Sequence, residues 1–544
     1  MLGKGKMLHA VLPILYFTVL LGLSAYGLHR LHLVFLCAKH RKAIGGAMHT
    51  PAISDDALPV VTIQLPLFNE STVAARLLDA VAAMDYPGHL LEIQVLDDST
   101  DETRALVRSH VERLRERGID AVYIHRVDRT GYKAGALDNG LKVAKGSLIA
   151  VFDADFIPPS GFLRAVVGHF IDPVVGMVQT RWGHINRDVS TLTQVQALML
   201  DGHHLVENRA RFGAGLLFNF SGTGGIWRRE AILAAGSWEH DTLTEDLDLS
   251  YRAQLAGWKF IYREDVVSPS ELPEDLSAVR AQQYRWAKGT VQTARKLMRR
   301  VLSSHLTFHQ RLEAFFHMTP HFAYPLLVLL SVMLLPALVL MPATNTMTML
   351  IVDLPLCTAT TGSLAAFYML AESAQGRSRL GALARLPMII ALGTGLAPHL
   401  SKAVFEGWTS MAGEFVRTPK QGDNKGRYRA RADLPLFETA LSALSLVSVV
   451  ASVQTGHYFA TPFALLFTIG YAYVAILVVS EQATRRRETT VAIAADARLA
   501  GGLVGEAAPL SEPPPSSGEV AYDPAAAAKP AWSEGRSASD HLAA

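Results

Sequence analysis

Two kinds of hydrophobic pattern alternate along this chain. Residues 10–28 form an apolar run without charge, and residues 322–341 and 347–370 form two more, joined by a short link. A helix of about 20 apolar residues spans the hydrocarbon core of a bilayer. Residues 439–453 and 463–480 have the pattern of a last hairpin. We therefore expect five membrane spans, although a signal peptide is an alternative for the first run.

A shorter apolar run, at residues 386–398, is followed closely by Lys402 and Glu406. It is too short to cross a bilayer comfortably, so we expect residues 386–412 to form an interfacial or re-entrant helix. Basic residues follow the first and the last apolar runs. The positive-inside tendency then places the N-terminus outside and the C-terminus in the cytoplasm. A sixth span at 386–408 would make one of these assignments fail.

The region between the first two apolar runs has a different pattern. Short apolar runs at residues 60–65, 91–96 and 148–152 alternate with helical stretches at 71–84 and 102–117. Strands that alternate with helices predict an α/β fold with a mostly parallel, Rossmann-like sheet. Functional residues of such a sheet lie beyond the carboxyl ends of its strands.

Composition agrees with a membrane protein that also has a folded domain. Half of the residues are hydrophobic and 18% are charged, whereas soluble domains have about 25% charged residues. The net charge is +2 and the chain has no dense basic patch, which argues against a nucleic-acid partner. Its two cysteines, Cys37 and Cys357, are too few for a disulfide framework or a zinc site. We therefore expect a reducing environment around the α/β domain.

These patterns divide the chain into consecutive parts. They are an N-terminal transmembrane helix (1–45), the α/β domain (52–310), a transmembrane hairpin (315–372), an interfacial helix with a following loop (386–435), a second hairpin (437–482) and a tail (488–544). The tail is rich in Ala, Pro, Ser and Glu and has few large apolar residues, so we expect it to be disordered.

Acidic residues follow two of the predicted strands. Asp153 and Asp155 come directly after the run 148–152, and two carboxylates at this spacing can bind one cation. Mg²⁺ and Mn²⁺ prefer such oxygen ligands. Asp97 and Asp98 follow the run 91–96 and are expected at the same edge of the sheet. The alternatives are a solvated turn for the first pair and the N-cap of a helix for the second.

Two further motifs lie on predicted helices. Glu245 and Asp246 begin a helical stretch, either as caps or as the general base that takes a proton from an attacking hydroxyl. Gln282, Arg285 and Trp286 share one face of a helix predicted at 276–295, since residues three and four apart are neighbours. Arginine binds phosphate with a planar fork, and tryptophan offers an apolar plate to a sugar ring. The alternative is an ordinary helix surface.

Smaller motifs add candidates for ligand binding. Lys133 lies between glycines, which suits close approach to a phosphate, and Gln179 follows another strand, where it can hold a donor or only pack. The run Ser221, Gly222 and Thr223 exposes backbone and hydroxyl groups that suit a carbohydrate acceptor, although a strained loop is the alternative. A basic juxtamembrane loop contains Phe415, Arg417, Thr418 and Lys420, which can close over a bound nucleotide or only contact the membrane.

In this order, the motifs D…DxD…TED…QxxRW resemble those of the processive β-glycosyltransferases of family 2, such as cellulose, hyaluronan and chitin synthases. The runs VLDDSTDET, RTGYKAGAL, FDADFIPP, FNFSGTGGIWRR and QQYRW look most like the cellulose synthase-like A and C groups. These groups include glucomannan 4-β-mannosyltransferases, which use GDP-mannose, and β-1,4-glucan synthases, which use UDP-glucose. The resemblance is strong over about residues 58–300 and weak in the membrane region.

The resemblance implies a GT-A fold and a role for each motif. Asp97 and Asp98 contact the nucleotide, and Asp153 and Asp155 hold Mg²⁺ or Mn²⁺ on the diphosphate. Asp246 is the catalytic base. Gln282, Arg285 and Trp286 bind the diphosphate and the end of the acceptor. Residues 415–420 match the position of a gating loop, but that loop usually reads F-x-V-T-x-K, so the match is incomplete. Residues 488–544 are too short and too low in complexity to match the C-terminal cyclic-dinucleotide-binding domain of bacterial cellulose synthase, so we do not expect that form of regulation.

The expected function is therefore the inverting polymerisation of a β-linked, 1,4-joined mannan, glucomannan or glucan and its passage through the membrane. The expected location is a bacterial inner or plasma membrane, with the catalytic domain in the cytosol. One alternative is the transfer of a single sugar to a lipid acceptor, which the Gln282–Trp286 motif disfavours. The other is a transporter or a partner subunit without activity, which the complete set of acidic residues disfavours.

Overall fold

The computed structural model describes residues 2–47, 49–341, 347, 358–411, 413 and 434–504. Residues 1–484 form one compact unit. Residues 485–544 form a second unit, whose described part is the end of one long helix.

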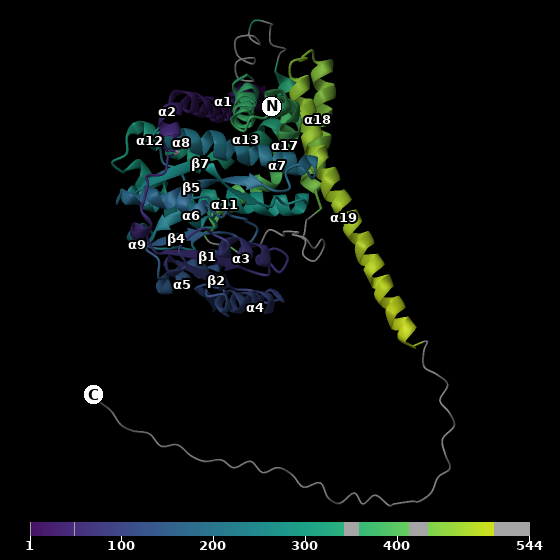
Figure 1. The fold of residues 1–544 in the computed structure, drawn as a ribbon. Helices are drawn as coiled ribbons and strands as arrows, with labels where there is room; N and C mark the ends of the chain where they lie inside the picture. Colours follow the sequence, from purple (N-terminus) through teal and green to yellow (C-terminus); the bar gives the residue numbers. More distant parts are fainter. Residues whose placement is uncertain are drawn as a thin grey trace, which may run out of the picture. The chain divides into compact units, whose positions relative to one another are not determined.

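A seven-stranded sheet forms the centre of the region between the first and second apolar helices. Its strands are β1 (Val61–Leu67), β2 (Leu91–Asp97), β3 (Ala121–His125), β4 (Leu148–Val151), β5 (Val175–His184), β6 (Gly225–Arg228) and β7 (Lys259–Ser270). They lie in the order β3-β2-β1-β4-β6-β5-β7 (Figure 1). Only β6 runs antiparallel to its neighbours, β4 and β5. The expected α/β fold with a mostly parallel sheet is confirmed.

Helices cover both faces of this sheet. On one face, α3 (Ala74–Ala82) and α4 (Thr103–Glu116) contribute to a core that includes Ala150 of β4. On the other, α5 (Tyr132–Val143), α9 (Arg229–Ala234) and α10 (Glu245–Leu255) contribute to a core that includes Ile149 and Val151. Successive side chains of a strand point to opposite faces, so both faces of β4 are buried, as expected for a central strand.

The parallel strands β1, β2 and β4 bring three loops to one edge of the sheet. Leu67 pairs with Asp97 across β1 and β2, and Gln64 pairs with Val151 across β1 and β4. Because these strands run in the same direction, the residues that follow them gather at the same edge. That edge holds the candidate site.

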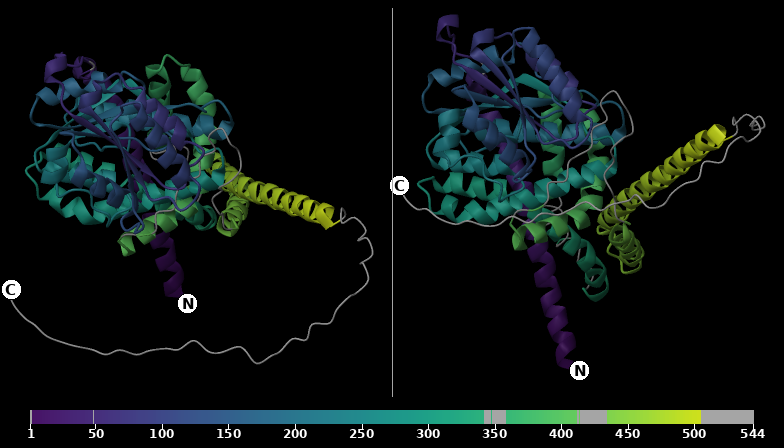
Figure 2. Two further views of the ribbon diagram at one scale, coloured as in Figure 1. Left: turned by 60° about the horizontal axis from the view of Figure 1, so that its bottom comes forward. Right: turned by 90° about the horizontal axis from the view of Figure 1, so that it is seen from below.

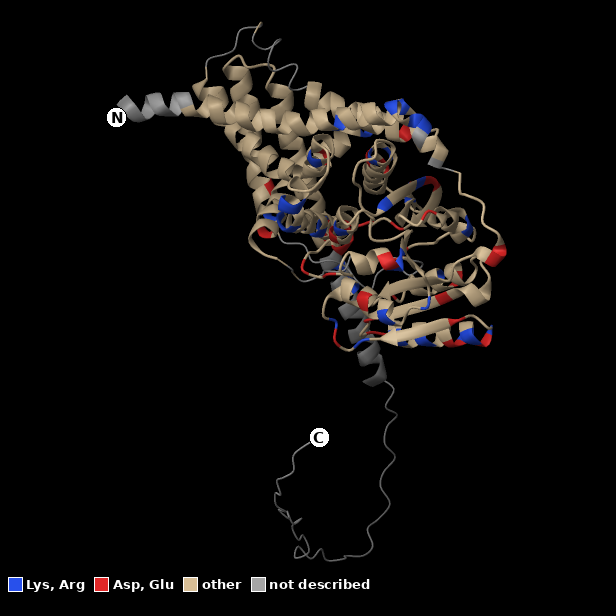
Figure 3. Ribbon diagram, turned by 90° about the vertical axis from the view of Figure 1, so that its left-hand side faces the viewer, with Lys and Arg blue, Asp and Glu red and all other residues tan. Residues whose placement is uncertain are grey.

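Five helices in the described part of the chain are long and apolar enough to cross a membrane, namely Val11–Lys39, Pro320–Leu340, Arg379–Thr409, Leu436–Gln454 and Thr461–Thr484. They belong to α1 (Leu2–Lys39), α13 (Ala323–Leu340), α17 (Arg379–Thr409), α18 (Leu436–Gln454) and α19 (Thr461–Val504). Figure 3 shows that charged residues gather on the sheet domain, whereas these helices are mostly uncharged. Their length and composition are those of an integral membrane protein.

Two helices, α11 (Leu276–Leu302) and α12 (Phe308–Met318), connect the sheet domain to α13. An interrupted helix, α7 (Thr191–Gly202) and α8 (Arg209–Gly213) with a π-helical segment between them, packs beside α1 and α16 (Ser363–Ala374). Figure 2 shows α1, in purple, leading away from the sheet toward its N-terminal end.

The structure differs from the sequence expectation in the length of two helices. The helix expected from residue 386 begins at Arg379, after Ser378, whose side chain accepts a hydrogen bond from the Gly381 N–H. With 31 residues it is long enough to span a bilayer, so the short length on which we based an interfacial or re-entrant helix does not hold. The last helix continues to Val504, although we expected disorder from residue 488. Five of the 17 extra residues, 488–504, are Ala, the strongest helix former. Residues 348–357 of the first expected hairpin and 505–544 of the expected tail lie outside the described residues.

Candidate active site

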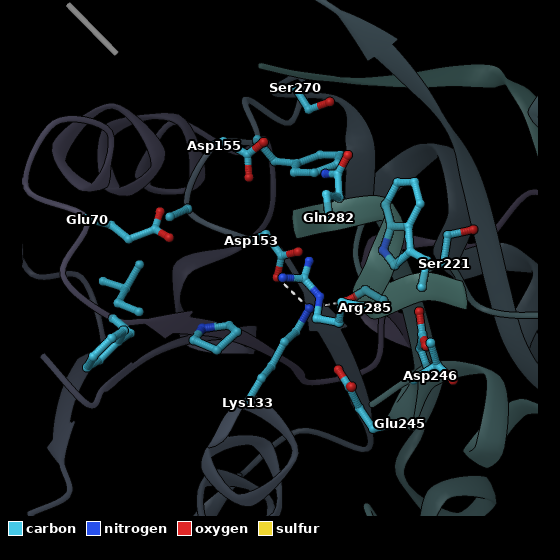
Figure 4. Close-up of a pocket in the computed structure, with 18 of the residues that line it drawn as sticks. Glu70, Lys133, Asp153, Asp155, Ser221, Glu245, Asp246, Ser270, Gln282 and Arg285 are labelled. Carbon is cyan, nitrogen blue, oxygen red and sulfur yellow. Dashed lines mark hydrogen bonds and ion pairs between the residues drawn. The ribbon is translucent and has the colours of Figure 1, made fainter. Parts of the chain in front are cut away.

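A cavity of about 170 Å³ lies beyond the carboxyl ends of β1 and β4, with α10 and α11 on its other side (Figure 4). It brings together most of the residues that the sequence motifs predicted. These are Asp98, Lys133, Asp153, Asp155, Ser221, Gly222, Glu245, Asp246, Gln282, Arg285 and Trp286. Motifs far apart in the sequence therefore meet in one place.

Lys133, in the first turn of α5, lies among the acidic groups of this cavity. Its Nζ is 2.5 Å from Asp153 Oδ1 and donates a hydrogen bond of 2.8 Å to the Gly222 carbonyl oxygen. Burial acts to lower the pKa of Lys133, but the nearby carboxylates of Asp153, Glu245 and Asp246 outweigh it and raise the pKa. Lys133 is therefore a cation near neutral pH. A buried cation of this kind suits a phosphate ligand.

Gly222 allows the loop before β6 to pass close to these charges. Its φ is +82°, a conformation that side chains rarely adopt. A Cβ at this position would lie 3.0 Å from Asp246 Oδ2 and 3.5 Å from Lys133 Nζ. Any larger residue would therefore strain the backbone and crowd the acidic cluster.

Glu245 and Asp246 occupy the first turn of α10. Asp246 Oδ1 accepts a hydrogen bond of 2.8 Å from the Leu247 N–H, while Thr244 at the N-cap makes no capping bond with its side chain. Burial and then the charge of Glu245 raise the pKa of Asp246 to about 7. Burial also raises the pKa of Glu245. A carboxylate with a pKa near neutrality is suited to accept a proton.

Helix α11 fixes the start of α10. Gln292 Oε1 accepts a hydrogen bond of 3.0 Å from the Leu243 N–H, and the hydroxyls of Thr244 and Thr293 are 3.1 Å apart. The contact is possible because α11 has Gly289 here, where a Cβ would lie 2.6 Å from Thr244 Cγ2. Side chains of α11 therefore hold the residues directly before α10, and with them the first turn that carries Asp246.

The same helix presents Gln282, Arg285 and Trp286 to the cavity, at the helical spacing expected. Burial lowers the pKa of Arg285, although the carboxylates of Glu245 and Asp153 oppose this. Figure 4 shows Arg285 beside Lys133 and Asp153. Two cations thus lie on the side of the cavity where an anionic ligand can be held.

Three of the predicted site residues do not line the cavity. Asp97 has no exposed surface, and its carboxylate accepts hydrogen bonds from the Ser99 N–H and the Tyr123 hydroxyl. Gln179 is also fully buried and supports the loop before β6, since its Oε1 accepts from the Ser221 N–H at 2.9 Å. Thr223 is buried, and its hydroxyl accepts from the Asp153 N–H at 2.9 Å. The structure thus shows these three side chains bonded within the protein.

Other residues line the cavity without having been chosen from the sequence. They include Phe68, Glu70 and Arg129; Trp182, which belongs to the predicted run that begins with Gln179, lines the cavity as well. The guanidinium of Arg129 lies 3.3 Å from the ring centre of Phe68, and Asp98 forms a bidentate ion pair with Arg126. Phe68 and Glu70 could have been predicted because they directly follow β1. Asp98 and Asp153 had been chosen on the same ground, as residues that follow the carboxyl end of a strand.

The donor set of this cavity fits a hard divalent cation. Asp153 and Asp155 come from one turn after β4 and both line the cavity, as does Glu271. Carboxylate oxygens are the ligands that Mg²⁺ and Mn²⁺ prefer. The acidic side chains are therefore suited to share such an ion with a phosphate ligand.

A second cavity, of about 870 Å³, lies among the apolar helices and reaches the first. Both are lined by Trp182, Leu200, Ser221, Thr244, Asp246, Gln282 and Trp286. Beyond this junction its walls come from α1, α13, α17 and α19, with residues such as Tyr26, Tyr324, Leu334 and Phe467. Residues 415, 417, 418 and 420 of the expected gating loop lie outside the described residues.

Comparison with known proteins agrees with the motifs. Residues 59–289 match the model of the family described as glycosyltransferase like family 2. The chain is 40% identical over 257 residues to glucomannan 4-beta-mannosyltransferase 1 of Oryza sativa subsp. japonica, which covers 46% of this chain and 49% of the relative. It is 42% identical over 249 residues to glucomannan 4-beta-mannosyltransferase 2 of Arabidopsis thaliana, covering 45% and 47%. The matches thus span about half the length of these relatives. Both are plant proteins, so they do not support the expected bacterial location.

Solved structures show a more distant similarity. The mannosyltransferase PcManGT from Pyrobaculum calidifontis, in complex with GDP-Man and Mn²⁺, is 22% identical with a TM-score of 0.44, covering 64% of this chain and 97% of that chain. TarS of S. aureus is 13% identical with a TM-score of 0.32, covering 64% and 54%.

Proposed function

Because residues 59–289 match the model of the family described as glycosyltransferase like family 2, we propose that the whole protein is a membrane-embedded, inverting β-glycan synthase that takes mannose from GDP-mannose. The product is a β-1,4-linked mannan or glucomannan. One observation supports this most directly: Asp246 lies in the wall shared by the charged cavity and the large cavity between the apolar helices. A base in that position can act on the end of a chain that extends into the second cavity.

In the proposed reaction, Asp246 takes the proton from the acceptor hydroxyl. That oxygen attacks the anomeric carbon of the donor sugar from the side opposite the diphosphate, which leaves, so an α-linked donor becomes a β-linked residue. The raised pKa of Asp246, about 7, suits this transfer near neutral pH. Burial and then the negative charge of Glu245 keep the pKa of Asp246 high.

The leaving diphosphate carries negative charge that the cavity can neutralise. Lys133 and Arg285 both line this side, and Lys133 is held by Asp153 and the Gly222 carbonyl oxygen. Fixed charges that meet charge developing in the transition state supply much of the catalysis in many enzymes. Asp153 and Asp155 would hold Mg²⁺ or Mn²⁺, which would stabilise the negative charge of the diphosphate. Asp98, which lines the cavity and pairs with Arg126, would contact the nucleotide.

The growing polysaccharide would occupy the second cavity. Trp286 and Trp182 line the junction and offer flat apolar surfaces to sugar rings, while Gln282 and Ser221 offer hydrogen bonds. The cavity continues between α1, α13 and α19 past tyrosine and phenylalanine side chains. The basic residues after the first apolar run support a cytosolic catalytic domain.

A donor screen tests this proposal. The purified protein, in Mg²⁺ or Mn²⁺, is given GDP-mannose, GDP-glucose, UDP-glucose or UDP-N-acetylglucosamine, and nucleoside diphosphate release and product size are measured. We expect release from GDP-mannose with a polymeric product that linkage analysis identifies as β-1,4. A lipid-soluble product with one added sugar would favour transfer to a lipid. The absence of release from every donor would contradict the enzymatic proposal.

A further inference from the structure

A cluster of histidines and one glutamate joins the first apolar helix to α12, away from the carboxylates of the reaction cavity. His29 and His32 lie on α1, and His309 and Glu313 lie on α12. His32 Nε2 is 3.2 Å from His309 Nε2 and 3.4 Å from Glu313 Oε1. These three ligand atoms all lie within 4.8 Å of one another.

The arrangement has the geometry of ligands around a transition-metal ion. Two nitrogens bound to a tetrahedral Zn²⁺ lie about 3.3 Å apart, given Zn–N distances of about 2.0–2.1 Å. The two Nε2 atoms are already at about this spacing, and His32 Nε2 also lies 3.4 Å from Glu313 Oε1. A hydrogen bond between them satisfies only one lone pair, whereas an ion would use both.

The fourth member of the cluster orients the carboxylate. His29 Nε2 is 2.9 Å from Glu313 Oε2, the oxygen that faces away from His32. Arg211 Nη1 also approaches this second oxygen, at 3.7 Å. Both contacts are made by Oε2, and Oε1 is the oxygen that lies 3.4 Å from His32 Nε2. Groups that hold a ligating carboxylate in this way are typical of protein metal sites.

We propose that His32, His309 and Glu313 bind a Zn²⁺ ion, with His29 as a positioning residue and solvent in the fourth position. Two imidazoles and one carboxylate form a donor set used for zinc, whereas Mg²⁺ and Mn²⁺ prefer oxygen alone. The chain would then hold two cations of different chemistry. The scarcity of cysteines had argued against a zinc site, but these ligands require none.

A second acidic cluster in the chain lacks these properties. Glu239, Asp241 and Asp248 also lie close together, but Lys296 Nζ sits among them, 2.7 Å from Asp241 Oδ1 and 3.0 Å from Asp248 Oδ1. A lysine already neutralises that cluster. At the histidine cluster, by contrast, Arg211 Nη1 is 3.7 Å from Glu313 Oε2, whereas His32 lies at the other oxygen, Oε1.

An ion at this position would fix a wall of the large cavity. Between the two helices, Tyr26 donates to the Thr319 hydroxyl at 3.3 Å and His29 stacks on Phe316. Tyr26 and Arg30, on the same helix as His29 and His32, line the large cavity. A bond from α12 through the ion to α1 would therefore hold the cavity wall while the product moves past it.

Metal analysis tests this inference. The full chain is purified with an affinity tag that contains no histidine, incubated with Zn²⁺, washed by dialysis and analysed for metal. The variant His32→Ala/His309→Ala removes two ligands that are partly or fully exposed, so we expect it to fold. His305→Ala, an exposed histidine just before α12, is the control.

We expect about one Zn²⁺ per chain in the wild type and in the control, and none in the double variant. Co²⁺ in place of Zn²⁺ should give the visible absorption of a four-coordinate site in the wild type and lose it in the double variant. The wild type should also unfold at a higher temperature with Zn²⁺ than after chelation. Zinc content that is equal in the wild type and the double variant, or absent from both, would overturn the inference. None of these readouts depends on glycosyl transfer.

Discussion

The two joined cavities differ in what their walls are made of. The cavity at the strand ends is lined by Asp153, Glu245, Asp246, Lys133 and Arg285, all held by bonds within the protein or by burial. The larger cavity is lined mainly by apolar and aromatic side chains of membrane helices. Departure of a charged diphosphate requires fixed charges to stabilise it. Movement of a neutral polysaccharide requires flat surfaces without strong hydrogen bonds. The difference supports a division of tasks, in which the first cavity carries out the reaction and the second holds the product as it moves.

The largest effect is expected from Asp246→Asn. This change keeps the shape of the side chain but removes the proton acceptor, so transfer should fall by about 10²–10⁴-fold. Binding of GDP-mannose, measured by calorimetry, should persist because the cations remain. Asp188→Asn, at an exposed position, is the control and should leave both quantities unchanged. Transfer at the wild-type rate by Asp246→Asn would remove Asp246 as the base.

Removal of the buried cation should have the next largest effect. Lys133→Met loses the group that we place on the diphosphate, so KM for the donor should rise by about 10–100-fold. Lys142→Met is a matched control on the same helix, since the Lys142 side chain is 67% exposed and pairs with Asp138. Equal KM values for the two variants would contradict a role of Lys133 in donor binding.

The pH dependence of the rate tests the environment of the base. Burial and Glu245 raise the pKa of Asp246 to about 7, and only the deprotonated carboxylate can accept a proton. The rate should therefore fall about tenfold per pH unit below this value and level off above it. Glu245→Gln removes the neighbouring negative charge, so the midpoint of the profile should move to lower pH. A midpoint that stays in place or moves upward would show that Glu245 does not act on Asp246 in this way.

The smallest effect is expected at the N-terminus of α11. Glu481 on α19 accepts hydrogen bonds from the Leu276 N–H at 2.5 Å and from the Ser277 hydroxyl at 2.6 Å, which caps the helix that presents Arg285. Glu481→Gln should destabilise the protein by about 1 kcal/mol and lower the rate only a few-fold. Thermal unfolding in detergent measures the first effect. Ser480→Ala, at an exposed position, is the control. If Glu481→Gln has the same Tm as this control, Glu481 does not stabilise the N-terminus of α11.

The two cavities also differ in how far the sequence could predict them. The sheet and the acidic strand ends could be predicted because they depend on local patterns and on the parallel direction of neighbouring strands. The sequence could not separate Asp98, which lines the cavity, from Asp97, which points into the protein. Nor could it show that Gln179 supports the loop, since this depends on how that loop folds back onto β5. The large cavity arises from contacts between helices distant in the chain, so no motif indicates it.

The most direct test of the shared path is crosslinking during synthesis. Leu334 on α13 lines the large cavity, whereas Val332, on the same helix, is 40% exposed and does not line it. A photoreactive phenylalanine analogue is placed at either position in a protein that is making polymer from labelled GDP-mannose. We predict that light attaches labelled polysaccharide to the protein at position 334 and not at 332, and that Asp246→Asn abolishes the labelling. Equal labelling at both positions, or none at 334 while polymer is made, would contradict the path through this cavity.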